Sequence, residues 1–243
     1  MNSQTVVTKQ SVVSLPTLAG WLIVLAGLMG LQQILPLTVN QGQQSSWLMV
    51  PVVGGLAWLG LILSGKTGFA PLWTTGVSNW QRFGRPFLLG LSLGAVMVLS
   101  ELVNPLGAEL QTPFPDSLIV FGQAGLVEEV IFHLFLTTGL VWLGSNVLLK
   151  GRHQTTVFWI AAIGISLLYW LMQVGAVYTY FPNKFSVMLG GQMLVMIGGT
   201  LTLGAYLFRQ HGFWAALSLR YGFYLVWHIL WAGGIGAIQY VLS

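Results

Sequence analysis

The chain has 243 residues, of which 55% are hydrophobic and only 6% are charged, and its formal net charge is +4. Soluble domains are about a quarter charged, so this composition excludes a soluble protein and predicts a single integral membrane domain over residues 1–243. The Lys and Arg residues are scattered singly, which argues against nucleic acid as a partner, and the absence of cysteine excludes disulfides and a cysteine nucleophile.

Seven apolar runs follow one another along the chain, each long enough to cross about 30 Å of hydrocarbon as a helix. They lie at 13–36, 46–64, 86–104, 117–141, 155–179, 185–207 and 213–242. The first run has no small-residue cleavage pattern at its end, so we expect a retained helix. The last run is long and contains Arg220 and Gly222, which leaves open an interfacial helix followed by a span from about Tyr221. We therefore predict an all-α bundle of seven transmembrane helices, with eight as the alternative.

Positive charges predict the orientation of this bundle, because Lys and Arg collect on the cytoplasmic side of a membrane. The N-terminus and the even-numbered connections contain seven cations, whereas the opposite side has Lys184 alone. The seven cations are Lys9, Lys66, Arg82, Arg85, Lys150, Arg152 and Arg209. The N-terminus is therefore predicted to be cytoplasmic.

The fourth run contains two adjacent carboxylates, Glu128 and Glu129, and a histidine, His133, among apolar residues. An ionised carboxylate in hydrocarbon costs at least about 2.5 to 3.5 kcal/mol, so such residues nearly always face a protein interior or a water-filled cavity. On a helix Glu129 and His133 share a face, and Glu128 lies about 100° further round. Glutamate and histidine could activate water as a general base, ligate a hydrated metal or relay a proton in a transporter, and intramembrane histidines also ligate haem or chlorophyll. Spacing alone does not choose between these chemistries.

Other polar residues lie within the remaining runs. Gln173 and Gln192 are expected to make hydrogen bonds between packed helices, and His228 either does the same or belongs to the site. Glu101 and Gln123 complete this set of intramembrane polar residues.

The order of these residues resembles the CPBP family of intramembrane proteases, which includes CAAX prenyl endopeptidases and the Abi proteins of bacteriocin processing and immunity. The motifs of that family are Glu-Glu-x-x-x-Arg, Phe-x-x-x-His and His-x-x-x-Asn or Asp, on three helices. The matching segments here are 128–133, with histidine in place of arginine; 169–173, with glutamine in place of histidine; and 228–232, with alanine in place of the amide. The glycine-rich segment 199–216 before His228 is also similar, and the motif-bearing region extends over 117–233.

The resemblance implies an endopeptidase that cleaves a membrane-associated peptide or protein with water as the nucleophile. It implies that Glu128 activates the water with Glu129 as its partner and His228 as a further catalytic group. His133, Gln173 and Tyr169 would support them, but glutamine cannot act as acid or base and Ala232 offers no donor, so a lowered rate is expected. The resemblance also implies a bacterial inner membrane or a thylakoid membrane.

Two alternatives remain open. A non-catalytic relative would use the same cavity, between the fourth, fifth and last spans, to bind a membrane protein, lipid or pigment as a scaffold or assembly factor. A proton-coupled transporter is the third hypothesis, although no repeat relates the two halves of the chain. Two glutamates and one histidine could accept a divalent metal, but an ordered water would explain them equally well.

Overall fold

The computed structural model describes residues 15–34, 47–70, 72–73, 76–105 and 112–235. Within these ranges all regular structure is helical and there is no strand, so the prediction of an all-α membrane protein is confirmed. The helices, in chain order, are α1 (Leu15–Ile34), α2 (Met49–Thr67), η2 (Trp80–Gly84), α3 (Arg85–Val103), α4 (Asp116–Glu128), η4 (Glu129–Thr137), α5 (Thr138–Val141), η5 (Trp142–Leu148), α6 (Gln154–Tyr180), η6 (Pro182–Lys184), α7 (Val187–Met193), η7 (Leu194–Gly198), α8 (Gly199–His211), α9 (Phe213–Tyr224) and η8 (Leu225–Ile235).

Several of these segments join end to end into long apolar helices. Five are long and apolar enough to cross a membrane: Met49–Thr67, Trp80–Val103, Asp116–Leu148, Gln154–Tyr180 and Val187–His211. Each coincides with one of the predicted runs to within a few residues, except that the fourth continues to residue 148. The end of the first predicted run and the residues after 235 lie outside the described ranges.

The last helix is continuous from 213 to 235, because α9 runs directly into η8. The structure therefore shows no helix boundary at Arg220 or Gly222, where the alternative places one. Arg220 is 4% exposed, so it lies inside the bundle. A buried carboxylate pair makes this position tolerable, as shown below.

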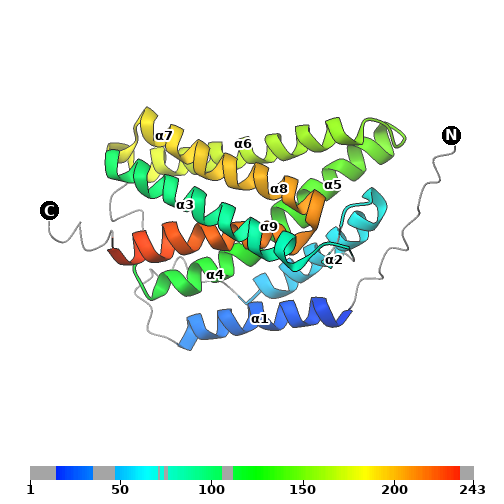
Figure 1. Ribbon diagram of the computed structural model, residues 1–243, viewed down its shortest axis with the longest axis horizontal. Coiled ribbons are helices and arrows are strands. Elements are labelled where there is room, and N and C mark those ends of the chain that lie inside the picture. The colour runs from blue at the N-terminus through cyan, green and yellow to red at the C-terminus, as the bar shows by residue number, and fades with distance from the viewer. Residues whose placement is uncertain (1–14, 35–46, 71, 74–75, 106–111, 236–243) are drawn as a thin grey trace.

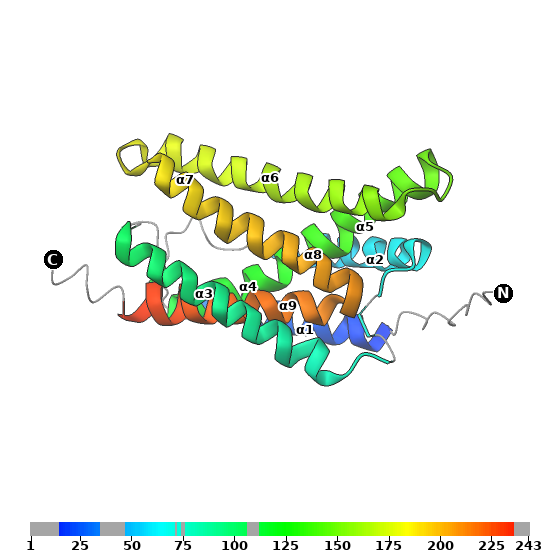
Figure 2. The same ribbon diagram turned by 45° about the horizontal axis from the view of Figure 1, so that its top comes forward.

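The helices lie roughly side by side along the long axis of the molecule (Figures 1 and 2), and in the view of Figure 1 α1 is at one edge and α6 at the other. The last helix is at the centre, packed against α3 and α8, and α2 packs against η4. Backbones meet where α3 crosses α9: a methyl group added at Gly90 would collide with the carbonyl oxygen of Leu219, and one added at Gly222 with that of Phe87. Such close approach through small residues is typical of helix packing in lipid, where no hydrophobic driving force acts between helices.

Large apolar side chains cover the outside of the bundle. On α6, for example, Leu168 is 61% and Met172 63% exposed, and many other Leu, Ile, Val and Trp side chains are similarly open. A soluble monomer rarely exposes so continuous an apolar surface, whereas lipid tails would cover it. The outer surface therefore agrees with the hydropathy of the chain.

Candidate functional site

The carboxylate pair lies at the junction of α4 and η4, deep in the bundle. Glu129 is 1% exposed, whereas the side chain of Glu128 retains 21%. The two residues point in different directions because successive side chains on a helix are rotated by about 100°. One carboxylate therefore reaches a cavity and the other is enclosed by protein.

A single arginine binds both carboxylates. Arg220 Nε lies 2.5 Å from Glu129 Oε1, and Arg220 Nη1 lies 2.5 Å from Glu128 Oε2. Both are charge-assisted hydrogen bonds between buried ions, which are stronger than neutral ones. Arg220 Nη2 is buried and has no hydrogen-bond partner in the part of the chain that the structure describes. The guanidinium supplies the positive charge that lets adjacent carboxylates lie inside an apolar bundle.

His133 completes the pairing of Glu129. His133 Nδ1 lies 2.5 Å from Glu129 Oε2, and His133 Nε2 lies 2.9 Å from the carbonyl oxygen of Leu201. Because a carbonyl oxygen only accepts, Nε2 must carry a hydrogen, and a second hydrogen must lie between Nδ1 and the carboxylate. Whichever atom holds that second hydrogen, the His133 and Glu129 pair has no net charge.

The whole cluster of Glu128, Glu129, His133 and Arg220 is therefore neutral: one carboxylate is balanced by the guanidinium and the other by the imidazole hydrogen. Uncompensated charge would cost several kcal/mol per ion in this environment. Gly204 on α8 makes the arrangement possible, because a methyl group there would lie 2.7 Å from His133 Cε1. Without a side chain at 204, α8 comes close enough for the carbonyl of Leu201 to reach the histidine.

Glu128 also accepts two tyrosine hydroxyls. Tyr224 Oη donates to Glu128 Oε2 at 2.7 Å, and Tyr169 Oη donates to Glu128 Oε1 at 3.0 Å. Arg220, Tyr224 and His228 are four residues apart in succession, so they share one face of the last helix and that face is turned toward Glu128. Oε1 has a single described donor, Tyr169, so a lone pair on that oxygen is open to another donor.

A cavity of about 130 Å³ lies next to Glu128. Its walls come from α4, α6, η7 with α8, and the last helix, and they include Phe121, Glu128, Tyr169, Gln173, Thr200, Arg220 and His228. A cavity needs roughly 10 to 15 Å³ for one water, so this one has room for several together with polar groups to hold them. Glu128 and His228, 100 residues apart in sequence, thus line one polar hollow inside an apolar bundle.

The imidazole of His228 is packed among aromatic rings. It is stacked on Phe121 with ring centroids 3.7 Å apart, and Tyr224 meets it edge-on at 5.1 Å. No hydrogen bond to its ring nitrogens is found within the described ranges of the chain, so the expectation of an interhelical hydrogen bond is not met. The ring is held in place by packing, and its nitrogens remain available to a molecule in the cavity.

The structure separates the six candidate residues into two groups. Glu128, His228, Tyr169 and Gln173 line the cavity, although the only described contact of the Gln173 amide is a long one, 3.5 Å, to Tyr169 Oη. The other two, Glu129 and His133, are 1% exposed and lie behind the cavity wall, so Glu129 does not converge on the cavity as expected. Helix rotation, which sequence does not reveal, decides this division.

Two residues of the candidate site were not predicted from the sequence: Arg220 and Tyr224. The signal for Arg220 was available, because an arginine in the middle of an apolar run needs a buried anion, and the Glu128 and Glu129 pair is the obvious source. Treating position 220 as a helix boundary concealed this. Tyr224 carried no distinguishing signal beyond its position one turn after Arg220.

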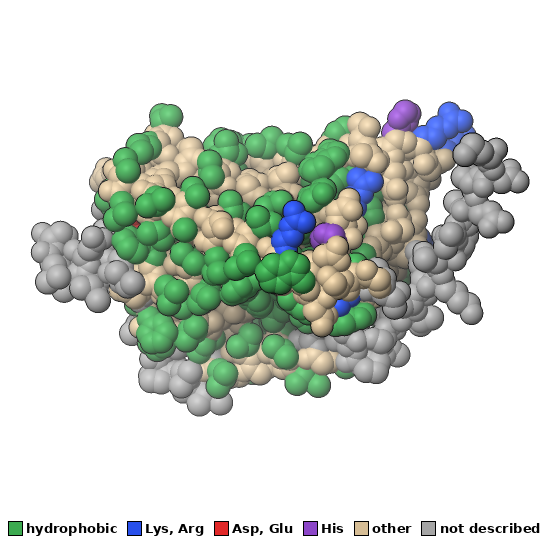
Figure 3. Space-filling model, in the orientation of Figure 1, with side chains coloured by type: hydrophobic (Ala, Val, Ile, Leu, Met, Phe, Trp, Pro, Cys, Tyr) green, Lys and Arg blue, Asp and Glu red, His purple; other side chains and the backbone are tan. Residues whose placement is uncertain are grey.

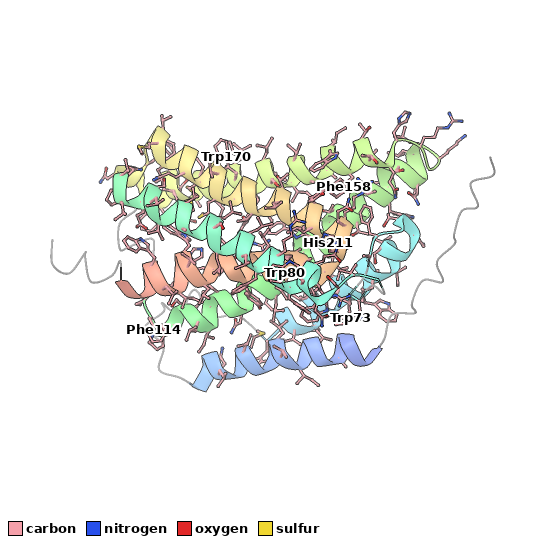
Figure 4. All side chains as sticks on the ribbon, viewed as in Figure 1. Trp73, Trp80, Phe114, Phe158, Trp170 and His211 are labelled. Carbon is pink, nitrogen blue, oxygen red and sulfur yellow. The ribbon has the colours of Figure 1, made fainter. Side chains whose placement is uncertain are left out.

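Other polar residues have structural partners. Gln192 Nε2 donates to Ser100 and Asn104, and Gln192 Oε1 accepts from Asn104 Nδ2 at 2.7 Å, so the prediction that Gln192 makes hydrogen bonds between helices is confirmed. Trp231 Nε1 donates to Glu101 Oε2 at 2.6 Å. Trp170 lies between α6 and α7, where Nε1 donates to the carbonyl of Gly190 (Figure 4). Neither tryptophan is among the cavity-lining residues.

The donor set of a metal site is not assembled in the part of the chain that the structure describes, since no three His, Asp or Glu side chains are grouped there as ligands. The two glutamates instead hold a guanidinium between them. These residues therefore do not fit a bound metal ion.

Comparisons with protein-family models, with curated proteins and with solved structures find no match to this chain.

Proposed function

We propose that this protein is an intramembrane endopeptidase of the CPBP type, with Glu128 as the base that activates water. The observation that carries the proposal is that Glu128, a carboxylate with an open lone pair, and His228, an imidazole with no hydrogen-bond partner among the described residues, line one hollow of about 130 Å³. Arg220 supports it further, because it places an arginine beside both glutamates, as the Glu-Glu-x-x-x-Arg motif places one near them in sequence. The motif position itself is His133.

In the proposed reaction a water in the cavity gives a hydrogen bond to Glu128 Oε1. Attack of the water oxygen on a peptide carbonyl carbon forms the new C–O bond while its proton passes to Glu128. Breaking the C–N bond then transfers that proton to the leaving nitrogen, which yields a carboxylic acid and an amine. His228 and the amide of Gln173 are the groups on the cavity wall that could donate to the developing oxyanion.

The site would act on a membrane-embedded protein or peptide, because all its walls lie inside an apolar bundle. We also propose seven transmembrane helices, with the N-terminus in the cytoplasm, and residence in a bacterial inner membrane or a thylakoid membrane. The charge distribution along the chain supports this orientation, because seven cations lie in the N-terminus and the even-numbered connections and Lys184 alone lies on the opposite side.

The proteolysis hypothesis is tested by reconstituting the full chain with a set of single-span membrane peptides in liposomes made in heavy-oxygen water. Cleavage with water as nucleophile leaves heavy oxygen in the new carboxyl terminus, which mass spectrometry detects. Glu128→Gln should abolish these products, whereas Glu101→Gln, which changes a buried carboxylate outside the cavity, should retain them. Products that persist with Glu128→Gln would rule out this role for Glu128.

A non-catalytic scaffold is the second candidate, and one observation favours it. Glu128 already accepts hydrogen bonds from Arg220, Tyr224 and Tyr169, which is the pattern of a structural polar core as much as of a base. In that case a membrane protein, lipid or pigment would bind against the cavity. Partner binding in a cross-linking experiment would then be unaffected by Glu128→Gln while no cleavage product appears with the wild type.

A further inference from the structure

The outer face of α6 has a second hollow, unrelated to Glu128. It is a shallow, open groove of about 550 Å³ on one face of the helix, and all of its lining residues lie on α6 between Thr155 and Leu167. The two residues at its start, Thr155 and Thr156, carry hydroxyl groups, and the rest of the groove is apolar, with Ile160 68% and Ile163 46% exposed. One end of the groove is therefore polar, and the rest of it is apolar.

An arginine without an acidic partner lies at the polar end. Arg209 Nη2 donates to Thr155 Oγ1 at 2.9 Å, and its guanidinium lies 4.6 Å from the ring centroid of Phe158. No carboxylate among the described residues pairs with Arg209. The preceding turn carries Arg152, which is exposed and adds positive charge to this end of the molecule but does not line the groove.

Aromatic side chains indicate where the groove lies relative to the membrane surface. Trp159 and Tyr206 are stacked with centroids 6.2 Å apart, and both are exposed, which is typical of rings at the level of lipid headgroups. Lys, Arg and His side chains on the visible face gather toward the same end of the molecule (Figure 3), where Phe158 and His211 are also found (Figure 4). The groove therefore starts at the proposed membrane surface and extends into the hydrocarbon layer.

We propose that this groove binds a phospholipid with an anionic headgroup. Phosphate oxygens would accept hydrogen bonds from Arg209 and Thr155, since a guanidinium presents a planar fork of donors to phosphate. One acyl chain would lie along Ile160, Ile163 and Leu167, a length of about 10 Å at 1.5 Å per residue. Charge complementarity at the polar end is what selects a phospholipid over an uncharged occupant. The site is independent of the proposed proteolysis.

The test is native mass spectrometry of the full chain titrated with phosphatidylglycerol or phosphatidylcholine in detergent. Phosphatidylglycerol should bind more tightly, and Arg209→Gln should weaken its binding about fivefold, corresponding to about 1 kcal/mol for one cation at a membrane surface. Arg209→Lys should largely restore binding. The matched control is Arg152→Gln, which removes an exposed charge at the same end but outside the groove and should have little effect.

A second pair of variants tests the apolar part. A Cβ atom added at Gly164 or Gly175 meets nothing within 4 Å, so both positions on α6 have open space where a side chain would begin. Gly164→Leu fills the groove and should weaken binding of phosphatidylglycerol, whereas Gly175→Leu, outside the groove, should not. Equal binding of the two lipids, or equal effects of each variant and its control, would overturn the proposal. If the wild-type chain is found as a dimer in these spectra and Gly164→Leu is found only as a monomer, the groove would be assigned to a second copy of the chain instead.

Discussion

Arg220 Nε lies 2.5 Å from Glu129 Oε1, and the two residues are 91 positions apart in the chain. The last helix therefore supplies the charge that the fourth predicted span requires. Because each ion is 5% exposed or less, the attraction between them is little screened by solvent. The pair joins two ends of the motif-bearing region into one unit, and most of the predictions below follow from it.

Removing the guanidinium should destabilise the fold strongly. Arg220→Gln leaves Glu128 and Glu129 with one positive partner between them, and breaking a buried ion pair from one side costs about 3 to 5 kcal/mol. Unfolding in detergent micelles, followed by tryptophan fluorescence, measures this loss. Arg152→Gln, at an exposed position, should change stability by less than about 0.5 kcal/mol.

Removing both partners should cost less than the sum of the single changes. The double variant Glu129→Gln with Arg220→Gln removes both ions of this contact, so a double-mutant cycle should give a coupling energy of about 1 to 3 kcal/mol. Strictly additive losses would mean that the pair contributes packing and not charge compensation.

Substitution of Glu129 should mainly lower stability, whereas substitution of Glu128 should mainly lower the rate of peptide cleavage. Glu129 is 1% exposed and fully paired, so Glu129→Gln should lower the free energy of unfolding by about 3 to 5 kcal/mol. Glu128→Gln, at a side chain 21% exposed, should cost roughly 1 to 3 kcal/mol but reduce peptide cleavage about 100-fold or more. Unfolding and cleavage should be measured on the same preparations of both variants. A Glu128→Gln variant less stable than Glu129→Gln would contradict the burial of these two side chains.

Two glycines of α8 should respond differently to alanine. A methyl group at Gly204 would collide with the His133 ring, so Gly204→Ala should destabilise by about 1 to 3 kcal/mol. At Gly199 a methyl group meets nothing within 4 Å, so Gly199→Ala should be neutral or stabilise the helix by up to about 1 kcal/mol. Thermal unfolding of the two variants side by side is the measurement. Equal stabilities would show that α8 does not approach His133 closely.

The proposed orientation can be tested directly because the chain contains no cysteine. Arg152 and Asn183 flank opposite ends of α6, and both are exposed. In intact cells a membrane-impermeant maleimide should label the Asn183→Cys variant, whereas Arg152→Cys should react only after the membrane is opened. The reverse pattern would place the N-terminus outside.

The sequence by itself determined the class of protein and nearly all the helix positions, because hydropathy is a local property and a helix in lipid satisfies its own backbone hydrogen bonds. It also identified Glu128, Glu129 and His228, since polar side chains in apolar runs are costly to place in hydrocarbon and therefore stand out. Only the tertiary structure decided that Arg220 balances the glutamates, that Glu129 and His133 are enclosed, and that Glu128 meets His228 at a cavity. These outcomes depend on how each helix is rotated about its axis. Close contacts at positions such as Gly90, Gly204 and Gly222 set that rotation, and no local pattern encodes it.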